Sequence, residues 1–298
     1  MAQAVRGIAR TAERIGARTR TGRNPGRITN LVALYAVLIL IAVFFLMPLV
    51  WMVSTSLKTE AGVFTDPGVI PRNPTLENFQ YLLTSGSDTP VFRWLLNSAI
   101  VSVIGTALTV LLTSLSAYAF ARMEFPGKSA LFWLMIATLL LPSVMFLVPQ
   151  FVVINMIGLF NSYPAFILPG LGGVFGVFFM RQFFMSIPRE MEEAAFIDGA
   201  GRLRIFRTIV LPLCGPAIAT LAVISFLAYW NDYLWPLIVC QGPGCTLPPG
   251  LRNLQGEYVT RYGLIMAGAV LSSIPVLAFY LVVQRWIIQS VASAGVKG

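Results

Sequence analysis

The chain contains no histidine among its 298 residues. Histidine is the commonest general base in proteins and the commonest metal ligand, so its absence excludes the most frequent catalytic and metal-binding arrangements. Charged residues are also scarce, at 11% of the chain, where soluble domains carry about 25%. No pair of carboxylates lies inside an apolar run. We therefore expect neither an enzyme nor a bound metal.

Long apolar runs take the place of what is missing, since 57% of the residues are hydrophobic and the mean hydropathy is +0.77. Five windows hold no charged residue, and the turn-rich segment Gly158–Pro164 splits the longest of them. A transmembrane helix needs about 20 apolar residues. The sequence therefore predicts an all-α membrane protein with six transmembrane helices, at roughly 31–53, 97–120, 130–151, 165–183, 213–235 and 263–285.

Positive charge is distributed unevenly between the two sides of these helices. With the N-terminus placed inside, 16 of the 21 lysines and arginines fall in the inside segments. Lysine and arginine concentrate in cytoplasmic segments, so we expect both termini and the polar stretch Ser186–Pro216 in the cytoplasm. The predicted location is the cytoplasmic membrane of a bacterium or archaeon, in a multi-pass arrangement.

Two segments divide the chain, a basic cytoplasmic tail over residues 1–27 and a transmembrane domain over residues 28–298. The tail holds seven arginines and one acidic residue, Glu13. Four of the arginines have the spacing of a basic helix that lies on anionic lipid: Arg6, Arg10, Arg14 and Arg18. A tail without fixed structure that only sets the orientation is the other interpretation, and both stay open.

The segment Gly127-Lys128-Ser129 looks like the end of a nucleotide-binding P-loop. That motif needs a glycine five positions before Gly127, where this chain has Arg122. We therefore expect no nucleotide-binding loop in this chain.

The stretch Ser186–Pro216 interrupts the apolar sequence with four of the 12 acidic residues and four arginines. Ser186 is suited to cap a helix whose first turn contains Pro188. Gly199 and Gly201 predict where this helix ends, because glycine adopts the left-handed conformation of a helix stop. Three acidic side chains near its start complement the helix dipole: Glu190, Glu192 and Glu193.

A second helix is expected from Arg202 to Val210, after which Leu211-Pro212 turn the chain into the fifth span. The product is a helix–glycine–helix elbow over residues 186–212. Its first helix presents apolar residues beside the acids Glu193 and Asp198, namely Ala194, Ala195 and Ile197. A solvated loop has no need of an apolar edge, so we interpret the elbow as a docking surface for a second protein.

Three motifs together resemble one family of transport proteins. Glu193-Ala-Ala-x-x-Asp-Gly-Ala, followed by Phe206, Ile209 and Leu211-Pro212, resembles the EAA motif in membrane subunits of bacterial ABC importers. The segments Phe226–Leu237, with Trp-Asn-Asp-Tyr-Leu-Trp-Pro, and Gln284–Gly298 are similar to the second, six-helix permease of maltose-type carbohydrate importers. The likeness covers the chain after the basic tail and implies the type I ABC importer permease fold. The long tail and the sequence Cys240-Gln-Gly-Pro-Gly-Cys245 depart from the family pattern.

The resemblance implies that the elbow couples this chain to a cytoplasmic ATPase. The residues carried over by position are Glu193, Ala194, Ala195, Asp198, Gly199 and Phe206. Glu193 would form a charge-assisted contact with an arginine of the ATPase, and Gly199 would set the elbow angle. The C-terminal residues Ala294–Gly298 resemble a tail that reaches the ATPase interface, and a frayed end is the alternative.

The same resemblance implies several partners: a second homologous permease, a pair of ATPase subunits that bind ATP and Mg, an extracytoplasmic substrate-binding protein and membrane lipid. No cofactor and no nucleic acid is expected on this chain. The implied cargo is a sugar or oligosaccharide, with glycerophosphodiesters and polyols as alternatives in the same family. An ion-coupled secondary transporter is disfavoured, because such proteins keep ionisable residues within the membrane and these spans carry only Asp232, near an outer edge.

Two features are expected on the outer side. The resemblance implies contact with the binding protein in the loop after Cys240, at Gln255, Gly256, Glu257 and Tyr258, with a plain connector as the alternative. Cys240 and Cys245 flank Gln-Gly-Pro-Gly, and a disulfide between them is chemically reasonable in an oxidising compartment. Two free thiols are the equally open alternative.

An aromatic and polar group lies near the outer end of the fifth span: Tyr229, Trp230, Asn231, Asp232, Tyr233 and Trp235. Aromatic faces with amide and carboxylate groups suit sugars, so this group is the candidate substrate path. The aromatic belt of any membrane protein has the same residue types, and in maltose-type importers the other permease holds most of the sugar. Pro142 and Pro149 predict a kinked third span, which either lines the path or serves packing alone.

Overall fold

The computed structural model describes residues 25–84, 90–252, 254 and 261–295. The chain forms two compact units, Met1–Trp51 and Met52–Gly298. All regular elements in the described ranges are helical, which confirms the predicted all-α class. In chain order they are α2 (Pro25–Ser56), α3 (Glu60–Thr65), α4 (Glu77–Thr84), α5 (Val91–Arg122), α6 (Lys128–Ala137), η1 (Thr138–Leu140), η2 (Ser143–Phe146), α7 (Leu147–Met156), α8 (Tyr163–Ile167), η3 (Leu168–Gly172), α9 (Val174–Ser186), α10 (Arg189–Ile197), α11 (Arg202–Ile205), η4 (Phe206–Val210), α12 (Leu211–Leu213), α13 (Gly215–Trp230), α14 (Leu234–Val239), η5 (Gly242–Gly244), α15 (Leu247–Arg252) and α16 (Tyr262–Gly295).

The described part of the first unit consists of helix α2 up to Trp51. Its side chains from Asn30 to Val50 are exposed around the whole circumference, although nearly all of them are apolar. A helix that is hydrophobic on every face belongs in a bilayer, and the segment Asn30–Ser56 is long enough to cross one. The predicted first span is therefore confirmed.

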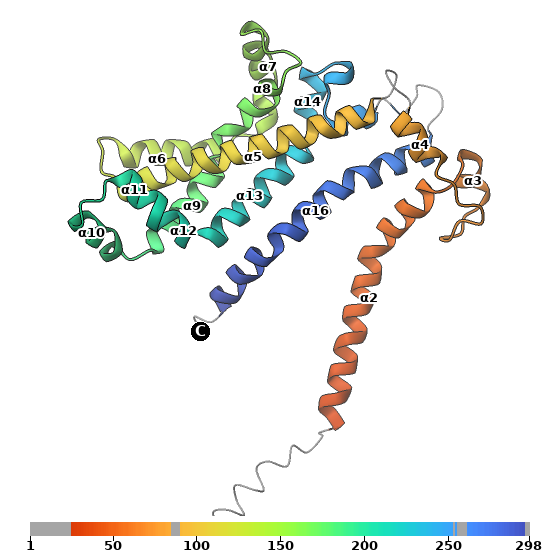
Figure 1. Cartoon of the computed structure of the whole chain (residues 1–298), viewed down its shortest axis with the longest axis horizontal. Coiled ribbons are helices and arrows are strands. Elements are labelled where there is room, and N and C mark those ends of the chain that lie inside the picture. Colours follow the sequence, from red (N-terminus) through yellow and green to blue (C-terminus); the bar gives the residue numbers. More distant parts are fainter. Residues whose placement is uncertain (1–24, 85–89, 253, 255–260, 296–298) are drawn as a thin grey trace, which may run out of the picture. The chain divides into compact units, whose positions relative to one another are not determined.

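Helix α5 is the centre of the second unit. Helices α9 and α13 pack along it, α15 and η5 pack near its Val91 end, and α16 packs on α13 (Figure 1). The packed face of α5 carries small hydroxyl side chains, which allow membrane helices to approach closely. These buried residues are Ser98, Ser102, Thr106, Thr109, Thr113 and Ser114.

Three of the six spans are bent. Lys128–Leu140 and Ser143–Met156 meet at 99°, Tyr163–Gly172 and Val174–Ser186 at 49°, and Arg202–Leu213 and Gly215–Trp230 at 82°. With α2, α5 and α16 these pairs make six spans in the described part of the chain, as predicted.

The predicted spans at 130–151, 165–183 and 213–235 are present as bent pairs, because the backbone leaves the helical conformation inside each. Leu141 is extended (φ −85°, ψ 126°) ahead of Pro142, as the ring of a following proline demands. Gly173 breaks the next span with φ −34° and ψ 66°. Helix α13 ends at Trp230, and a new helix begins only at Leu234.

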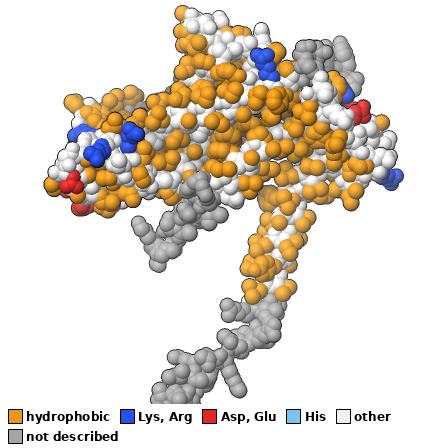
Figure 2. All heavy atoms as spheres, viewed as in Figure 1, with side chains coloured by type: hydrophobic (Ala, Val, Ile, Leu, Met, Phe, Trp, Pro, Cys, Tyr) orange, Lys and Arg blue, Asp and Glu red, His pale blue; other side chains and the backbone are white. Residues whose placement is uncertain are grey.

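Two buried clusters lie toward opposite ends of α5. The tryptophan cluster, at the Val91 end, includes Trp94, Trp230, Trp235 and Leu247. The elbow cluster, at the Arg122 end, includes Tyr118, Phe184, Ile205, Phe206 and Val210. Figure 2 shows charged side chains gathered around α10 and α11, and a broad apolar band over the middle of this unit. This distribution fits a protein whose middle lies in lipid.

Candidate functional site: an elbow and a cavity

The first helix of the elbow begins two residues later than the sequence suggested, with Pro188 rather than Ser186 at its N-cap position. Ser186 is the last residue of α9, and its hydroxyl donates to the Phe183 carbonyl at 2.7 Å. The prediction that Ser186 caps the next helix is therefore wrong. Ile187 is extended ahead of Pro188, and α10 starts at Arg189 without a side-chain cap.

The end of α10 is a glycine stop. Gly199 has φ +81°, and its N–H donates to the Phe196 carbonyl at 3.0 Å, while Ala200 N–H donates to the Ala195 carbonyl at 2.9 Å. This pair of bonds is the Schellman arrangement, which needs a left-handed residue at the position of Gly199. Gly201 has φ −71° and opens α11. The predicted stop is confirmed at Gly199, and Gly201 belongs to the start of the second helix.

Most of the predicted coupling residues lie together on the surface of α10. Glu193, Ala194, Asp198 and Gly199 are exposed. The apolar side chain of Ile197 is 87% exposed beside them. Ala195 is half-buried against the elbow cluster.

Phe206 does not share this surface. It is 2% exposed, and its ring lies 5.0 Å from that of Tyr118 and 6.3 Å from that of Phe184, between centroids. It fills the space between α5 and α9, so a direct contact between Phe206 and another protein is excluded in this conformation.

Glu192 is buried, although the sequence offers no reason to distinguish it from Glu190 and Glu193. It is 5% exposed, and its Oε1 forms an ion pair with Arg122 Nε at 2.7 Å. The Tyr118 hydroxyl donates to Glu192 Oε2 at 3.2 Å, and Arg122 Nη2 donates to the Ile187 carbonyl at 2.6 Å. A buried carboxylate is tolerated only with such partners. The signal in the sequence was Arg122, a single charge at the end of an uncharged span.

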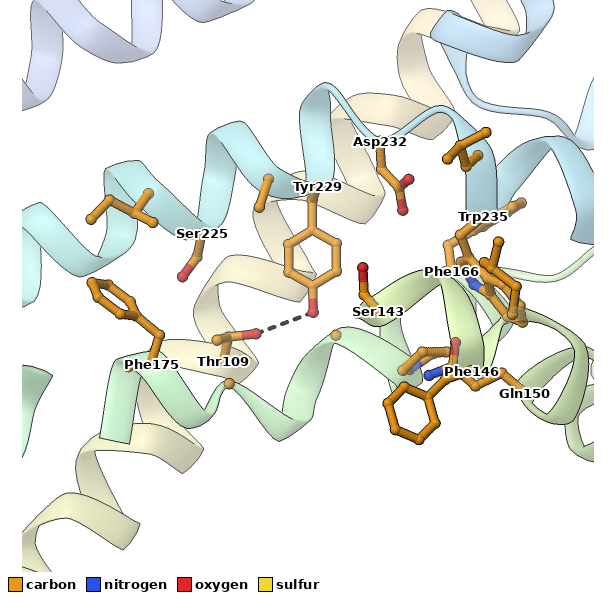
Figure 3. A pocket seen from close by; sticks show the side chains of 18 of the residues that line it. Thr109, Ser143, Phe146, Gln150, Phe166, Phe175, Ser225, Tyr229, Asp232 and Trp235 are labelled. Carbon is orange, nitrogen blue, oxygen red and sulfur yellow. Dashed lines mark hydrogen bonds between the residues drawn. The ribbon is translucent and has the colours of Figure 1, made fainter. Parts of the chain in front are cut away.

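A cavity of about 450 Å³ opens among α5, η2, α7, η3, α9, α13 and α14 (Figure 3). Its wall is mostly apolar and aromatic, with several groups that can form hydrogen bonds. These polar residues are Thr109, Ser143, Gln150, Ser225, Tyr229 and Asp232. Of the described residues, Asp232 is the only charged one in the lining, and no lysine or arginine lines it.

Tyr229 is fixed in this wall by two glycines. A methyl group at Gly105 would approach the Tyr229 ring to 2.8 Å, and one at Gly170 would approach its hydroxyl oxygen to 2.5 Å. The hydroxyl lies 3.1 Å from Thr109 Oγ1 and donates to the Ile167 carbonyl at 3.2 Å. Tyr229 on α13 therefore bonds to α5 and α8 and packs against η3 at the cavity.

Asp232 stands where α13 has ended, half-buried at the same wall. The backbone N–H groups of Trp235 and Tyr233 donate hydrogen bonds to its carboxylate. The side chain therefore also holds the start of α14.

The predicted substrate group does not stay together. Tyr229, Asp232 and Trp235 line the cavity. Trp230 is 2% exposed inside the tryptophan cluster, where its ring stacks on that of Phe226 at 5.7 Å. Trp230 is therefore a core residue and its predicted place on the substrate path is wrong.

Asn231 is exposed, and the Tyr233 hydroxyl accepts from Arg252 Nη1 at 3.2 Å. Neither residue lines the cavity. Sequence reasoning missed Thr109, Ser143 and Gln150. For Ser143 and Gln150 a signal existed, because each follows directly after a proline in the third span.

Cys240 and Cys245 form a disulfide, with Cα atoms 5.0 Å apart. The enclosed turn is tied to α5. Trp94 Nε1 donates to the Gly242 carbonyl at 3.0 Å, and Asn97 Nδ2 donates to the carbonyls of Pro243 and Cys245 at 3.0 and 2.8 Å. The two cysteines thus belong to a turn that is fixed on the Val91 end of α5.

The remaining predicted contact residues fall largely outside the description. Gln255, Gly256, Glu257 and Tyr258 lie beyond the described residues, as does most of the basic tail 1–27. Helix α16 includes Ala294 and Gly295, and residues 296–298 are not described. Among the described residues, no group of three or more Cys, Asp or Glu side chains is placed to hold a metal ion.

Residues 110–293 match the family model of the binding-protein-dependent transport system inner membrane component. The chain is 34% identical over 269 residues to the arabinooligosaccharides transport system permease protein AraQ of Halalkalibacterium halodurans, covering 89% of this chain and 94% of that one. It is also 34% identical over 268 residues to the sn-glycerol-3-phosphate transport system permease protein UgpE of Yersinia pestis, covering 87% and 95%.

A similar fold occurs in the crystal structure of a bacterial ABC transporter involved in the import of the acidic polysaccharide alginate. The TM-score is 0.74 at 22% identity, over 90% of this chain and 99% of that chain. At this identity the likeness concerns the fold alone.

Proposed function

Because this chain belongs to the family of binding-protein-dependent transport system inner membrane components, we propose that it is the permease subunit of an ATP-driven importer whose cargo is a neutral oligosaccharide. It is a transport subunit rather than an enzyme. The observation that carries the cargo assignment is the cavity, with its aromatic and hydroxyl lining and its single carboxylate.

The elbow is the surface that the ATPase contacts and moves during ATP hydrolysis. Ile197 is 87% exposed next to exposed Glu193 and Asp198, and an apolar side chain among acids at a loop suits a partially apolar cleft. Glu193 makes a charge-assisted contact with an arginine of the ATPase. Gly199 sets the direction in which the chain leaves that contact.

The partners follow from the family and from the exposed surfaces. A pair of ATPase subunits with ATP and Mg lies on the cytoplasmic side, together with both termini, and a binding protein docks on the opposite side, near the disulfide turn. A second permease covers part of the apolar surface. Support for it comes from the exposed apolar side chains of α6, η1 and η2, among them Trp133, Leu140 and Met145.

The charge of the cavity wall distinguishes among the candidate cargoes. A phosphate group is recognised by arginine, lysine or a metal ion, and the described lining has none of these. Asp232 would repel an anion, whereas sugar hydroxyls donate hydrogen bonds to a carboxylate and stack on aromatic rings. Neutral oligosaccharides and polyols therefore fit this wall, and glycerophosphodiesters do not.

The test is the purified complex reconstituted in proteoliposomes with its binding protein. ATP hydrolysis is measured with neutral oligosaccharides, a polyol, glycerophosphodiesters and sn-glycerol 3-phosphate in turn. We expect stimulation by a neutral saccharide and none by the phosphate compounds. Stimulation by a phosphate compound alone would overturn the assignment of cargo, and a chain that recruits no ATPase would overturn the proposed function itself.

A further inference from the structure

Helix α10 packs on the rest of the chain through the buried Glu192 and the half-buried Ala195. Of its nine residues, Glu192 is the only one that is buried. The other two glutamates of the helix, Glu190 and Glu193, are exposed. An amphipathic surface helix is ordinarily held by a stripe of apolar side chains. Here the apolar contact is reduced to Ala195, and a carboxylate occupies the one fully buried position.

The partners of this carboxylate all come from the last turn of α5. Tyr118 and Arg122 are four residues apart and therefore lie on one face of that helix. The Glu192 and Arg122 side chains are only 6% and 8% exposed. Arg122 also bonds the Ile187 carbonyl, just before α10 begins. We name the three side chains Tyr118, Arg122 and Glu192 the α5–α10 clamp.

A buried ion pair is a poor source of stability, because apolar residues of similar volume often serve the fold equally well. The hydrogen bonds around it do specify position. The Tyr118 hydroxyl bonds Glu192 Oε2, and Arg122 Nη2 bonds the Ile187 carbonyl. The contact between Arg122 Nε and Glu192 Oε1 is an ion pair without hydrogen-bond geometry. The two hydrogen bonds fix the direction of α10 relative to α5, and the ion pair holds the carboxylate beside Arg122. The ion pair therefore points to a requirement for position rather than for stability alone.

Helix α5 connects the clamp to the cavity. It runs without a break from Val91 to Arg122, and Thr109 lies 13 residues before Arg122, which is roughly 20 Å along a helix. Thr109 contacts the Tyr229 hydroxyl at the cavity wall. The two helical segments that flank α10 in sequence belong to spans bent by 49° and 82°. An unbroken helix transmits a displacement more directly than a bent one.

We propose that the α5–α10 clamp transmits the movement of α10 to α5, and through Thr109 and Tyr229 to the cavity. The proposal rests on the proposed function, in which an ATPase moves α10. Tyr118, Arg122 and Glu192 are positioning residues in this scheme, since none of them contacts cargo or nucleotide. Breaking the clamp uncouples ATP hydrolysis from transport.

The test compares carboxyl-to-amide variants in the reconstituted complex. The readout is the number of cargo molecules transported per ATP hydrolysed. We expect Glu192→Gln to lower this ratio at least tenfold, because an amide cannot form the ion pair with Arg122. The matched control is Glu190→Gln, an exposed carboxylate on the same helix, for which we expect a ratio within twofold of the unmodified complex.

A second variant covers the case in which Glu192→Gln fails to assemble. Tyr118→Phe keeps the ring in the elbow cluster and removes only the hydroxyl bond to Glu192. We therefore expect normal assembly and a ratio lowered about threefold, a smaller loss than that of the ion pair. Co-purification of the ATPase is scored separately. If no ATPase binds the unmodified chain, the proposed function fails; if it binds and neither variant changes the ratio, the clamp fails.

Discussion

The two ends of α5 are held by different chemistry. At the Val91 end, Trp94 and Asn97 donate neutral hydrogen bonds to the carbonyls of a turn that is closed by a disulfide. At the Arg122 end, one buried ion pair and two hydrogen bonds hold a helix of which Glu192 is buried and Ala195 half-buried. The first arrangement is redundant and covalently closed, so it fixes a turn. The second has few contacts and is centred on a single carboxylate, so the attached helix can be driven from outside.

The largest effect is expected when one contact is removed at each end of α5 and the losses of stability are compared. Arg122→Ala leaves the Glu192 carboxylate buried and unpaired, which costs about 3–5 kcal/mol. Asn97→Ala leaves the carbonyls of Pro243 and Cys245 without a donor and costs about 1–3 kcal/mol. Thermal unfolding of the two variants in the same detergent ranks them. A lower unfolding temperature for Asn97→Ala than for Arg122→Ala would contradict the expected order of the two contacts.

The disulfide should matter for stability and not for coupling. Replacing both Cys240 and Cys245 by serine removes a short closed loop and costs about 2 kcal/mol. The expected result is a lower unfolding temperature with an unchanged ratio of cargo to ATP. A Cys214→Ser variant, which removes the buried free thiol, is the control for loss of a cysteine. A fall in the transport ratio on removal of the disulfide would show that this end also transmits movement.

Between the two ends of α5, a substitution beside Tyr229 tests whether the cavity wall is as tightly packed as the distances indicate. Gly170→Ala places a methyl group against the Tyr229 hydroxyl and should cost about 1–3 kcal/mol through overpacking. Gly172→Ala, two residues on in the same short helix, meets open space and serves as the matched control. Equal unfolding temperatures for the two variants would contradict the packing described here.

The smallest effect concerns the far end of α10. Gly199→Ala forces a side chain into the left-handed region at φ +81°, which costs about 1 kcal/mol. Gly201→Ala is expected to be nearly neutral, because φ is −71° there. We expect the first variant alone to weaken co-purification of the ATPase, since it changes the direction of the elbow. Similar behaviour of the two variants would remove Gly199 from the coupling scheme.

The sequence predicted the elements whose causes are local. Uncharged runs of sufficient length located the spans, and glycine chemistry located the end of α10 at Gly199. The bends were not predictable in the same way. Pro142 predicted the bend in the third span, but the angle of 99° depends on the residues that pack around the break.

The clamp and the cavity depend on contacts between distant residues. Glu190, Glu192 and Glu193 look equivalent in the sequence, and only the packing of α10 on α5 decides that Glu192 faces inward. Tyr229 and Trp230 are adjacent and point to different surroundings, because Gly105 and Gly170 leave room for one ring and the tryptophan cluster encloses the other. Such choices follow from tertiary packing, which a single sequence does not display.

One measurement tests the central claim most directly, the distance between spin labels on α10 and α5 in the reconstituted complex during ATP turnover. Labels at Glu190 and Leu115, both exposed positions, report the relation of the two helices. We predict one distance in every nucleotide state, because the clamp makes α10 and α5 move together, and a spread of distances in the Glu192→Gln variant. A distance that changes with nucleotide in the unmodified complex would contradict transmission through the clamp.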